Sequence, residues 1–180
     1  MKPSELKDIL DKHRLWFEGD GEQGKRADLR GVDLRGADLR GAYLERAYLR
    51  GANLRGANLQ GANLPGANLV RVYLRGAYLQ GANLYGANLG GAYLQGANLY
   101  GANLGGADLG DAYLQDANLQ GANLRSAYLQ GATFTTNFRK VEWFEEATFS
   151  EDQIAWVCLH PKFGEWESAL KWVKASADAA

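Results

Sequence analysis

The sequence predicts an all-β solenoid with a helical cap at each end. A five-residue unit repeats 22 times in succession from Ala27 to about Thr136, with Leu at its third position in the first 21 units and Phe134 in the last. The first position is Ala in every unit except those of Val32 and Val72. An unbroken short period is typical of proteins in which each unit stacks only on its neighbours, so the repeat determines the fold class.

The period of five requires the chain to bend after every unit. On an extended chain, residues two apart project to the same face, so Ala27 and Leu29 point one way and Asp28 the other. The next step, from Leu29 to Val32, is three residues, which would reverse the face unless a corner intervened. Neither the helical period of 3.6 nor simple strand alternation fits this spacing. Repeated corners therefore wind the chain around a core of Leu and Ala.

The corner residue is the fifth of each unit, and it is Gly in 16 of the 21 Leu-centred units. A type II turn needs a positive φ at its third residue, which Gly adopts without strain, and it favours Pro at the second. Leu64-Pro65-Gly66-Ala67 therefore indicates a type II corner. We expect a different turn type at the five corners that lack Gly, which are Arg46, Arg71, Asp111, Asp116 and Ser126. Asp111 and Asp116 also allow a cation site, although replacement of corner glycines is the simpler interpretation.

Units such as Ala-Asn-Leu-Gln-Gly and Ala-Asp-Leu-Arg-Gly resemble those of the pentapeptide-repeat proteins over about 110 of the 180 residues. The resemblance implies a right-handed quadrilateral β-helix of about 22 pentapeptide repeats, with four units, or 20 residues, per coil. Arg residues recur at a spacing of 20, as in Arg35, Arg55 and Arg75, but the Tyr positions fit 15 about as often. The residues alone leave the number of sides open.

Both flanks are predicted to cover the open ends of the solenoid, within one structural domain. We expect residues 1–26 to form an N-terminal helical cap, 27–136 the β-helix, and 137–180 a degenerate repeat and a C-terminal helical cap. In the first flank, Ser4 is the predicted N-cap and Gly19-Asp20-Gly21 the predicted end of a helix. Its apolar face, which we expect to lie on the first coil, comprises Leu6, Ile9, Leu10, His13 and Phe17.

The C-terminal flank keeps one unit in phase, Ala147-Thr148-Phe149, before two predicted helices. Ser150 and Gln153 form a capping-box signature for the first helix. The second, from about Glu165, carries an apolar stripe that either folds over the last coil or forms a dimer face. The stripe consists of Trp166, Leu170 and Val173.

Composition favours a cytoplasmic protein without catalytic chemistry. The formal net charge is −1, no stretch approaches the 18 consecutive apolar residues of a membrane span, and residues 1–19 lack a secretory pattern. The single cysteine, Cys158, excludes an internal disulfide. Cys158 and His160 lack a third partner for a metal site or an activated nucleophile. We therefore expect no enzyme activity, no cofactor and no metal.

The second and fourth positions of each unit face outward and supply the candidate binding surface. With 20 residues per coil, one wall carries six candidate residues, which are Arg35, Arg55, Arg75, Tyr73, Tyr93 and Tyr113. Aromatic and guanidinium groups of this kind dominate protein interfaces. The same columns would also form if Tyr and Arg only stabilised a β surface by stacking along the rod. The Asp residues at 28, 33 and 38 are expected to neutralise nearby arginines.

Three functions are compatible with this surface. A non-catalytic scaffold that recognises a protein partner is the usual expectation for a rod without a pocket. The resemblance implies a second function, mimicry of duplex DNA toward type II topoisomerases, to inhibit or protect them. That function requires an acidic surface, whereas residues 27–75 carry eight Arg against four acidic residues. The third function, nucleic-acid binding by the Arg-rich wall, is disfavoured by the slightly acidic chain.

Overall fold

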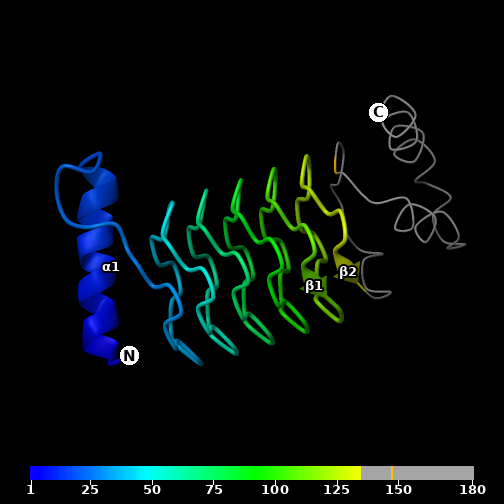
Figure 1. Cartoon of the computed structure of the whole chain (residues 1–180), viewed down its shortest axis with the longest axis horizontal. Coiled ribbons are helices and arrows are strands. Elements are labelled where there is room, and N and C mark those ends of the chain that lie inside the picture. Colours follow the sequence, from blue (N-terminus) through cyan, green and yellow to red (C-terminus); the bar gives the residue numbers. More distant parts are fainter. Residues whose placement is uncertain (135–146, 148–180) are drawn as a thin grey trace, which may run out of the picture.

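The chain forms a helix followed by a stack of regular coils. A computed structural model describes residues 1–134 and Ala147. Helix α1 (Pro3–Glu18) lies across one end of the stack, and two short strands, β1 (Tyr113–Leu114) and β2 (Thr133–Phe134), lie in its later coils (Figure 1). Within the described part of the chain, no helix is long and apolar enough to span a membrane.

A parallel ladder with a spacing of 20 residues joins successive coils. The second residue of each unit pairs with the second residue 20 positions on, from Asp28 with Tyr48 to Asp108 with Tyr128. Strands β1 and β2 continue this ladder, with Tyr113 opposite Thr133. Because each unit has five residues and ends in a corner, 20 residues per coil means four sides. The structure thus decides between the spacings of 15 and 20 that the sequence left open.

The backbone hydrogen bonds of one unit show why the coil is stable. The N–H groups of the second and third residues bond to neighbouring coils, as in Tyr48 to the Ala27 carbonyl at 3.0 Å and Leu29 to the Tyr48 carbonyl at 2.7 Å. The N–H of the fourth residue is bonded within its own unit where the second residue is Asn or Asp. In the first unit, the Asp28 carboxylate accepts the Arg30 N–H at 3.3 Å. Asn and Asp are therefore suited to the second position by local hydrogen bonding.

All the described corners share one geometry, which corrects one prediction. The five corner residues other than Gly have φ between 53° and 58°, the same left-handed region as the corner glycines. At each of these corners the next residue also donates the turn hydrogen bond, as Val72 N–H does to the Leu69 carbonyl at 3.0 Å. The expectation of a different turn type at these corners is wrong, because the ladder above and below outweighs the strain of one non-Gly residue. The five residues are Arg46, Arg71, Asp111, Asp116 and Ser126.

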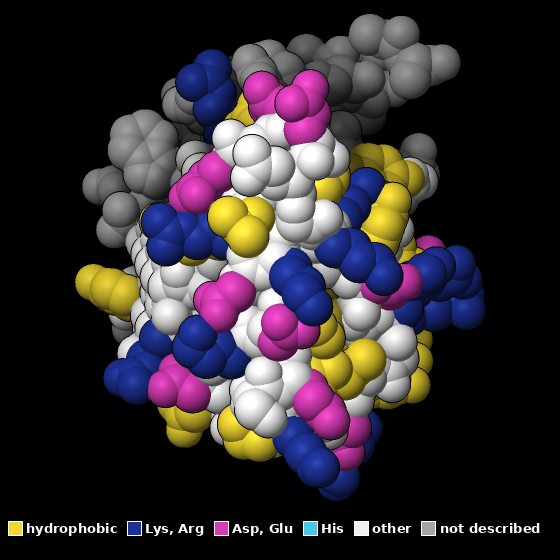
Figure 2. All heavy atoms as spheres, turned by 90° about the vertical axis from the view of Figure 1, so that its left-hand side faces the viewer, with side chains coloured by type: hydrophobic (Ala, Val, Ile, Leu, Met, Phe, Trp, Pro, Cys, Tyr) yellow, Lys and Arg dark blue, Asp and Glu magenta, His cyan; other side chains and the backbone are white. Residues whose placement is uncertain are grey.

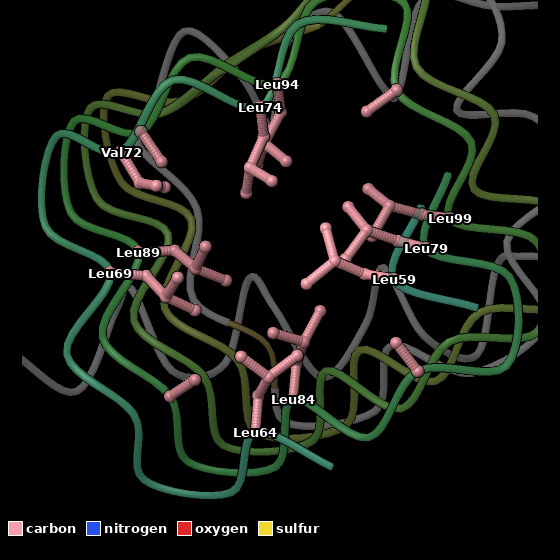
Figure 3. Packing of buried hydrophobic residues seen from close by; sticks show 14 of the residues in the cluster. Leu59, Leu64, Leu69, Val72, Leu74, Leu79, Leu84, Leu89, Leu94 and Leu99 are labelled. Carbon is pink, nitrogen blue, oxygen red and sulfur yellow. The ribbon is translucent and has the colours of Figure 1, made fainter. Parts of the chain in front are cut away.

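The core is a set of inward-pointing Leu and Ala columns. Figure 3 shows Leu59, Leu79 and Leu99 stacked from three successive coils, with columns from the other sides pointing toward the same centre. Leu79 is 1% exposed and Ala77 fully buried. Ala147, which the sequence assigns to a degenerate unit, is also buried in this core. Each column repeats one contact in every coil, so the packing is continuous along the rod.

Helix α1 covers the first coil, with two differences from the prediction. The helix begins at Pro3 rather than after Ser4, because Lys2 is the N-cap, Pro3 occupies the first turn and the Glu5 carboxylate accepts the Lys2 N–H at 3.1 Å. Leu6 and His13 are buried as expected, whereas Phe17 is 40% exposed. Trp16 takes the inner position in its place, with its ring 5.5 Å from that of His13. The helix ends at Glu18, as Gly19-Asp20-Gly21 predicts.

The exposed surface of α1 is mostly charged, with Leu15 and Phe17 as its large exposed apolar side chains. Figure 2 shows this end of the molecule with basic and acidic side chains interspersed. Three ion pairs four residues apart line the helix, and they are Lys7–Asp11, Asp8–Lys12 and Arg14–Glu18. A charged cap of this kind protects the end of a β-helix from pairing with another chain. The corresponding predictions for the other end, including the two helices and the stripe of Trp166, Leu170 and Val173, lie outside the described residues.

Candidate functional site

The three tyrosines predicted to share a wall form one stacked column. The ring centroids of Tyr73 and Tyr93 are 4.9 Å apart and those of Tyr93 and Tyr113 are 5.1 Å apart, with interplanar angles of 4° and 1°. This spacing follows from the ladder, because neighbouring strands lie about 4.8 Å apart. Tyr113 remains 39% exposed. We call these three residues the tyrosine column.

The three arginines of the predicted strip lie on the same wall but differ in their environment. Arg35 is paired with Asp33 at 2.7 Å. The Arg55 guanidinium lies 5.2 Å from the centroid of the Tyr73 ring. Arg75 is exposed and forms no ion pair with any described residue. The free positive charge of the wall therefore begins in the second coil.

Pairs of Asp and Arg occupy three of the four units of the first coil, as the sequence predicts. Side chains at the second and fourth positions of one unit point to the same side, so each Asp accepts two hydrogen bonds from one guanidinium. The hydrogen bond from Arg40 lowers the pKa of Asp38 to about 2, and Arg30 lowers the pKa of Asp28 in the same way. These carboxylates remain ionised, and their arginines remain paired, at neutral pH.

A groove of about 700 Å³ borders the tyrosine column. Its floor contains Gly90 and Gly110, which occupy the fourth position, where most units carry an outward side chain. A Cβ at Gly90 would meet only the Asn88 carboxamide closely, at 3.2 Å, so the space above it is open. At Gly110 the Tyr128 ring approaches to 2.9 Å from that point and closes one end of the groove. The groove exists because two side chains are missing.

The two ends of the groove carry opposite charge. Arg71 lies in the third coil at one end, and Asp108 and Asp111 lie in the fifth coil toward the other. One oxygen of Asp108 accepts the Gly110 N–H at 3.0 Å. Arg71 and Asp111 are exposed and form no ion pair with any described residue. The sequence predicted Arg71 only as a corner and Asp111 as a corner or part of a cation site with Asp116, and it did not predict the groove. The signal for the groove was Gly at the fourth position.

A second polar cluster lies under helix α1. The His13 ring is fully buried and its Nδ1 accepts the Ala27 N–H at 3.1 Å. Burial lowers the pKa of His13, and the backbone of Glu45 offsets part of this effect. Burial also raises the pKa of the Glu45 carboxyl group. Arg26 closes the cluster, with hydrogen bonds of 2.6 Å to the Arg46 carbonyl and the Tyr48 hydroxyl. The His13–Ala27 hydrogen bond joins the helix to the first coil, and Arg26 joins the segment after the helix to the first and second coils.

The other sequence candidates do not form a site in the described part of the chain. Asp111 and Asp116 occupy successive corners on opposite sides of the Tyr113 unit. No group of three His, Cys, Asp or Glu residues among residues 1–134 and Ala147 is arranged to hold a metal ion. Cys158 and His160 lie outside the described residues.

Comparisons with known proteins agree with the geometry of the coils. A family model described as pentapeptide repeats matches residues 27–66, 52–91, 67–106 and 107–135. A solved pentapeptide repeat protein from the thylakoid lumen of Arabidopsis thaliana is 31% identical, with 72% of this chain and 77% of that chain covered and a TM-score of 0.57. No curated protein matches the sequence significantly.

Two further solved structures are less similar overall. HetL, a pentapeptide repeat protein involved in heterocyst differentiation regulation in the cyanobacterium Nostoc sp. strain PCC 7120, is 34% identical. The match covers 70% of this chain and 59% of HetL, with a TM-score of 0.45. QnrB1, a plasmid-mediated fluoroquinolone resistance protein, is 20% identical over 77% of this chain and 74% of its own, with a TM-score of 0.37. That similarity is too low to carry over the role of QnrB1.

Proposed function

The chain belongs to the pentapeptide-repeat family, and from this premise we propose that it is a non-catalytic scaffold that binds a protein partner. The binding surface is the tyrosine column together with Arg55 and Arg75. The observation that carries the proposal is the stack of three parallel rings on a wall whose arginines are unpaired from the second coil onward. The same side-chain types recur along this wall, and such a surface is suited to contact with the surface of a partner protein. Catalysis instead needs different chemical groups that converge on one point.

The wall has the physical properties of an interface. Tyr and Arg are enriched among the residues that contribute most to binding between proteins. The ladder fixes the backbone under every ring, and stacking restricts Tyr93 between Tyr73 and Tyr113. Little conformational entropy is therefore lost when a partner covers these side chains.

The distribution of charge disfavours the two alternatives. A DNA mimic needs a dense negative surface, whereas residues 27–75 have eight Arg against four acidic residues. Nucleic-acid binding needs free cationic groups, but three of these arginines are held by Asp side chains in the first coil. We therefore favour a protein partner over a topoisomerase or DNA.

Location and assembly form part of the same proposal. The single cysteine supports a cytoplasmic location, where disulfides are rare. The protein is proposed to act as a monomer or as a dimer formed through C-terminal residues, and it requires no cofactor.

The test is quantitative capture of a partner from an extract of the source cells. The variant Tyr93→Ser/Tyr113→Ser removes two rings of the column, and the control Tyr85→Ser/Tyr100→Ser removes two exposed rings from other walls. We expect the first variant, and not the control, to reduce capture of the same partner by about tenfold or more, the effect of about 1.4 kcal/mol. Equal capture by both variants would contradict the proposal.

Two assays test the alternatives directly. Salt-sensitive binding to duplex DNA, measured at two salt concentrations, would favour the nucleic-acid function. Inhibition or protection of a type II topoisomerase in a supercoiling assay would favour DNA mimicry. The scaffold proposal predicts neither result.

A further inference from the structure

We propose that the groove beside the tyrosine column binds an extended peptide segment of about four residues, with an acidic side chain near Arg71 and a basic side chain near Asp111. The groove lies along the edge between the walls of Gly90 and Tyr93. This inference rests on the proposed function and names the chemistry of the partner segment that the scaffold recognises.

The shape of the groove fits an extended chain that runs parallel to the rod. The groove extends from the coil of Arg71 to the coil of Tyr128, which are three coils apart. With about 4.8 Å between coils, this length is about 14 Å, which an extended peptide spans with about four residues at about 3.3 Å each. The groove is open along its length and is floored by Gly90 and Gly110, so a peptide backbone is able to approach the coil closely.

The lining of the groove determines which side chains fit at its middle. The Tyr93 and Tyr113 rings line one side of the groove. Val70 precedes Gly90 in the same column of fourth positions and lies at the Arg71 end. Asn88, on the other side, accepts the Gly90 N–H at 3.0 Å and presents its amide group to the surface. An apolar or aromatic side chain of the segment would lie against the rings, and its backbone would lie over the glycines.

The charges at the ends determine the charge pattern of the segment. Arg71 and Asp111 occupy the same corner column two coils apart, which corresponds to about 10 Å. An extended segment in the polyproline II conformation has three residues per turn and a rise of about 3.1 Å, so side chains three residues apart lie on the same face about 9 Å apart. Neither is paired with a described residue, so each is able to bind an opposite charge without breaking an existing ion pair. Exposed ion pairs contribute little affinity, so these charges mainly set selectivity.

The probe for this inference is the peptide Ac-Glu-Val-Tyr-Lys-NH₂, titrated into the full ¹⁵N-labelled chain. We expect the amide signals of Gly90, Gly91 and Gly110 to shift, with a dissociation constant below about 1 mM. Peptides with Glu at both ends or Lys at both ends should bind at least threefold more weakly, because one end would meet a like charge. Absence of shifts at about 5 mM peptide, or shifts on another wall only, would overturn the inference.

Two sets of variants separate the groove from a general surface effect. Gly90→Gln fills the floor with a residue that the array already uses at the fourth position, as at Gln95. We expect at least tenfold weaker binding. Gly105→Gln makes the same change at a fourth-position glycine outside the groove, where the exposed Tyr85 ring is the neighbour, and should leave binding unchanged.

The charge variants test the roles of the two ends. Arg71→Glu and Asp111→Lys should each weaken binding at least threefold. The double variant should restore it, because the peptide is able to bind in the reverse direction. Failure of the double variant to restore binding would refute the assignment of the charges.

Capture of the cellular partner by the groove variant and by the tyrosine variant tests the groove and the scaffold function separately. If Gly90→Gln still captures the cellular partner while Tyr93→Ser/Tyr113→Ser does not, the groove inference is overturned and the scaffold function stands. If both variants lose the partner and Gly105→Gln retains it, both conclusions are supported. If neither variant changes capture, both are overturned.

Discussion

Substitution of corner glycines should destabilise the coil through backbone strain alone. Gly56, Gly81 and Gly96 have φ of 63°, 63° and 64°, and no atom lies within 4 Å of the point where a Cβ would be added. The left-handed conformation costs a non-Gly residue about 1 to 2 kcal/mol. Replacing Gly by Ala also lowers the conformational entropy of the unfolded chain, which stabilises the folded protein by about 0.4 to 1 kcal/mol. The net cost is therefore about 0.8 kcal/mol for each Ala.

The triple variant Gly56→Ala/Gly81→Ala/Gly96→Ala is expected to lose about 2.5 kcal/mol of unfolding free energy, since the three corners share no partners and their effects add. Urea denaturation followed by circular dichroism measures this loss. Gly90→Ala is the control, because φ at Gly90 is not positive, and it should change stability by less than about 0.5 kcal/mol. Arg71→Gly should stabilise the protein by about 0.8 kcal/mol, because it relieves the same strain. A triple variant as stable as the control would refute this account of the corners.

Three further predictions concern the core, the helical cap and the first coil. Leu79→Ala should lower the free energy of unfolding, measured by urea denaturation, by about 2.7 to 5 kcal/mol. The control Tyr78→Ala, at the neighbouring exposed position, should lower it by less than about 1 kcal/mol. Similar losses in the two variants would contradict the buried position of Leu79 in the core. Burial lowers the pKa of His13 below its ordinary value of 6.5, so the unfolded chain takes up a proton first as the pH falls, and stability decreases below about pH 6.5. This decrease should be smaller in His13→Gln, which keeps an acceptor for the Ala27 N–H, and an unchanged pH dependence would show that His13 is not its source. The carboxyl group of Asp38 should titrate at about pH 2 by NMR, and Arg40→Gln should return its pKa toward 3.8; a variant that leaves the titration unchanged would exclude the ion pair as the cause.

The columns of the wall were predictable from sequence because one residue type repeats at a fixed interval. Once the coil length is known, Tyr73, Tyr93 and Tyr113 fall above one another, and Asp33 and Arg35 fall on the same side of one unit. The non-Gly corners were not predictable from local propensity. At Arg71, the strain of about 1 to 2 kcal/mol is opposed by the turn hydrogen bond of Val72 and by the bond from the Arg71 N–H to the Gly90 carbonyl. Contacts between coils decide the conformation there.

The groove was missed for a different physical reason. Chemically active side chains are what mark a site in a sequence, whereas the groove arises where Gly90 and Gly110 carry no side chain. Arg71 and Asp111 form a pair of end charges because a coil of 20 residues places both in one corner column. Gly105 shows that Gly at the fourth position is not a sufficient signal, because the Tyr85 ring lies beside it. The shape of a surface depends on neighbours 20 residues away.

Photo-crosslinking in the source cells tests the central claim most directly. A photoreactive phenylalanine analogue replaces Tyr113 in the tyrosine column, or the exposed Tyr100 on another wall as the control. The scaffold account predicts a discrete crosslinked protein at position 113 that is absent at position 100. Identical products at both positions, or none at position 113, would contradict the claim that this wall is the binding surface.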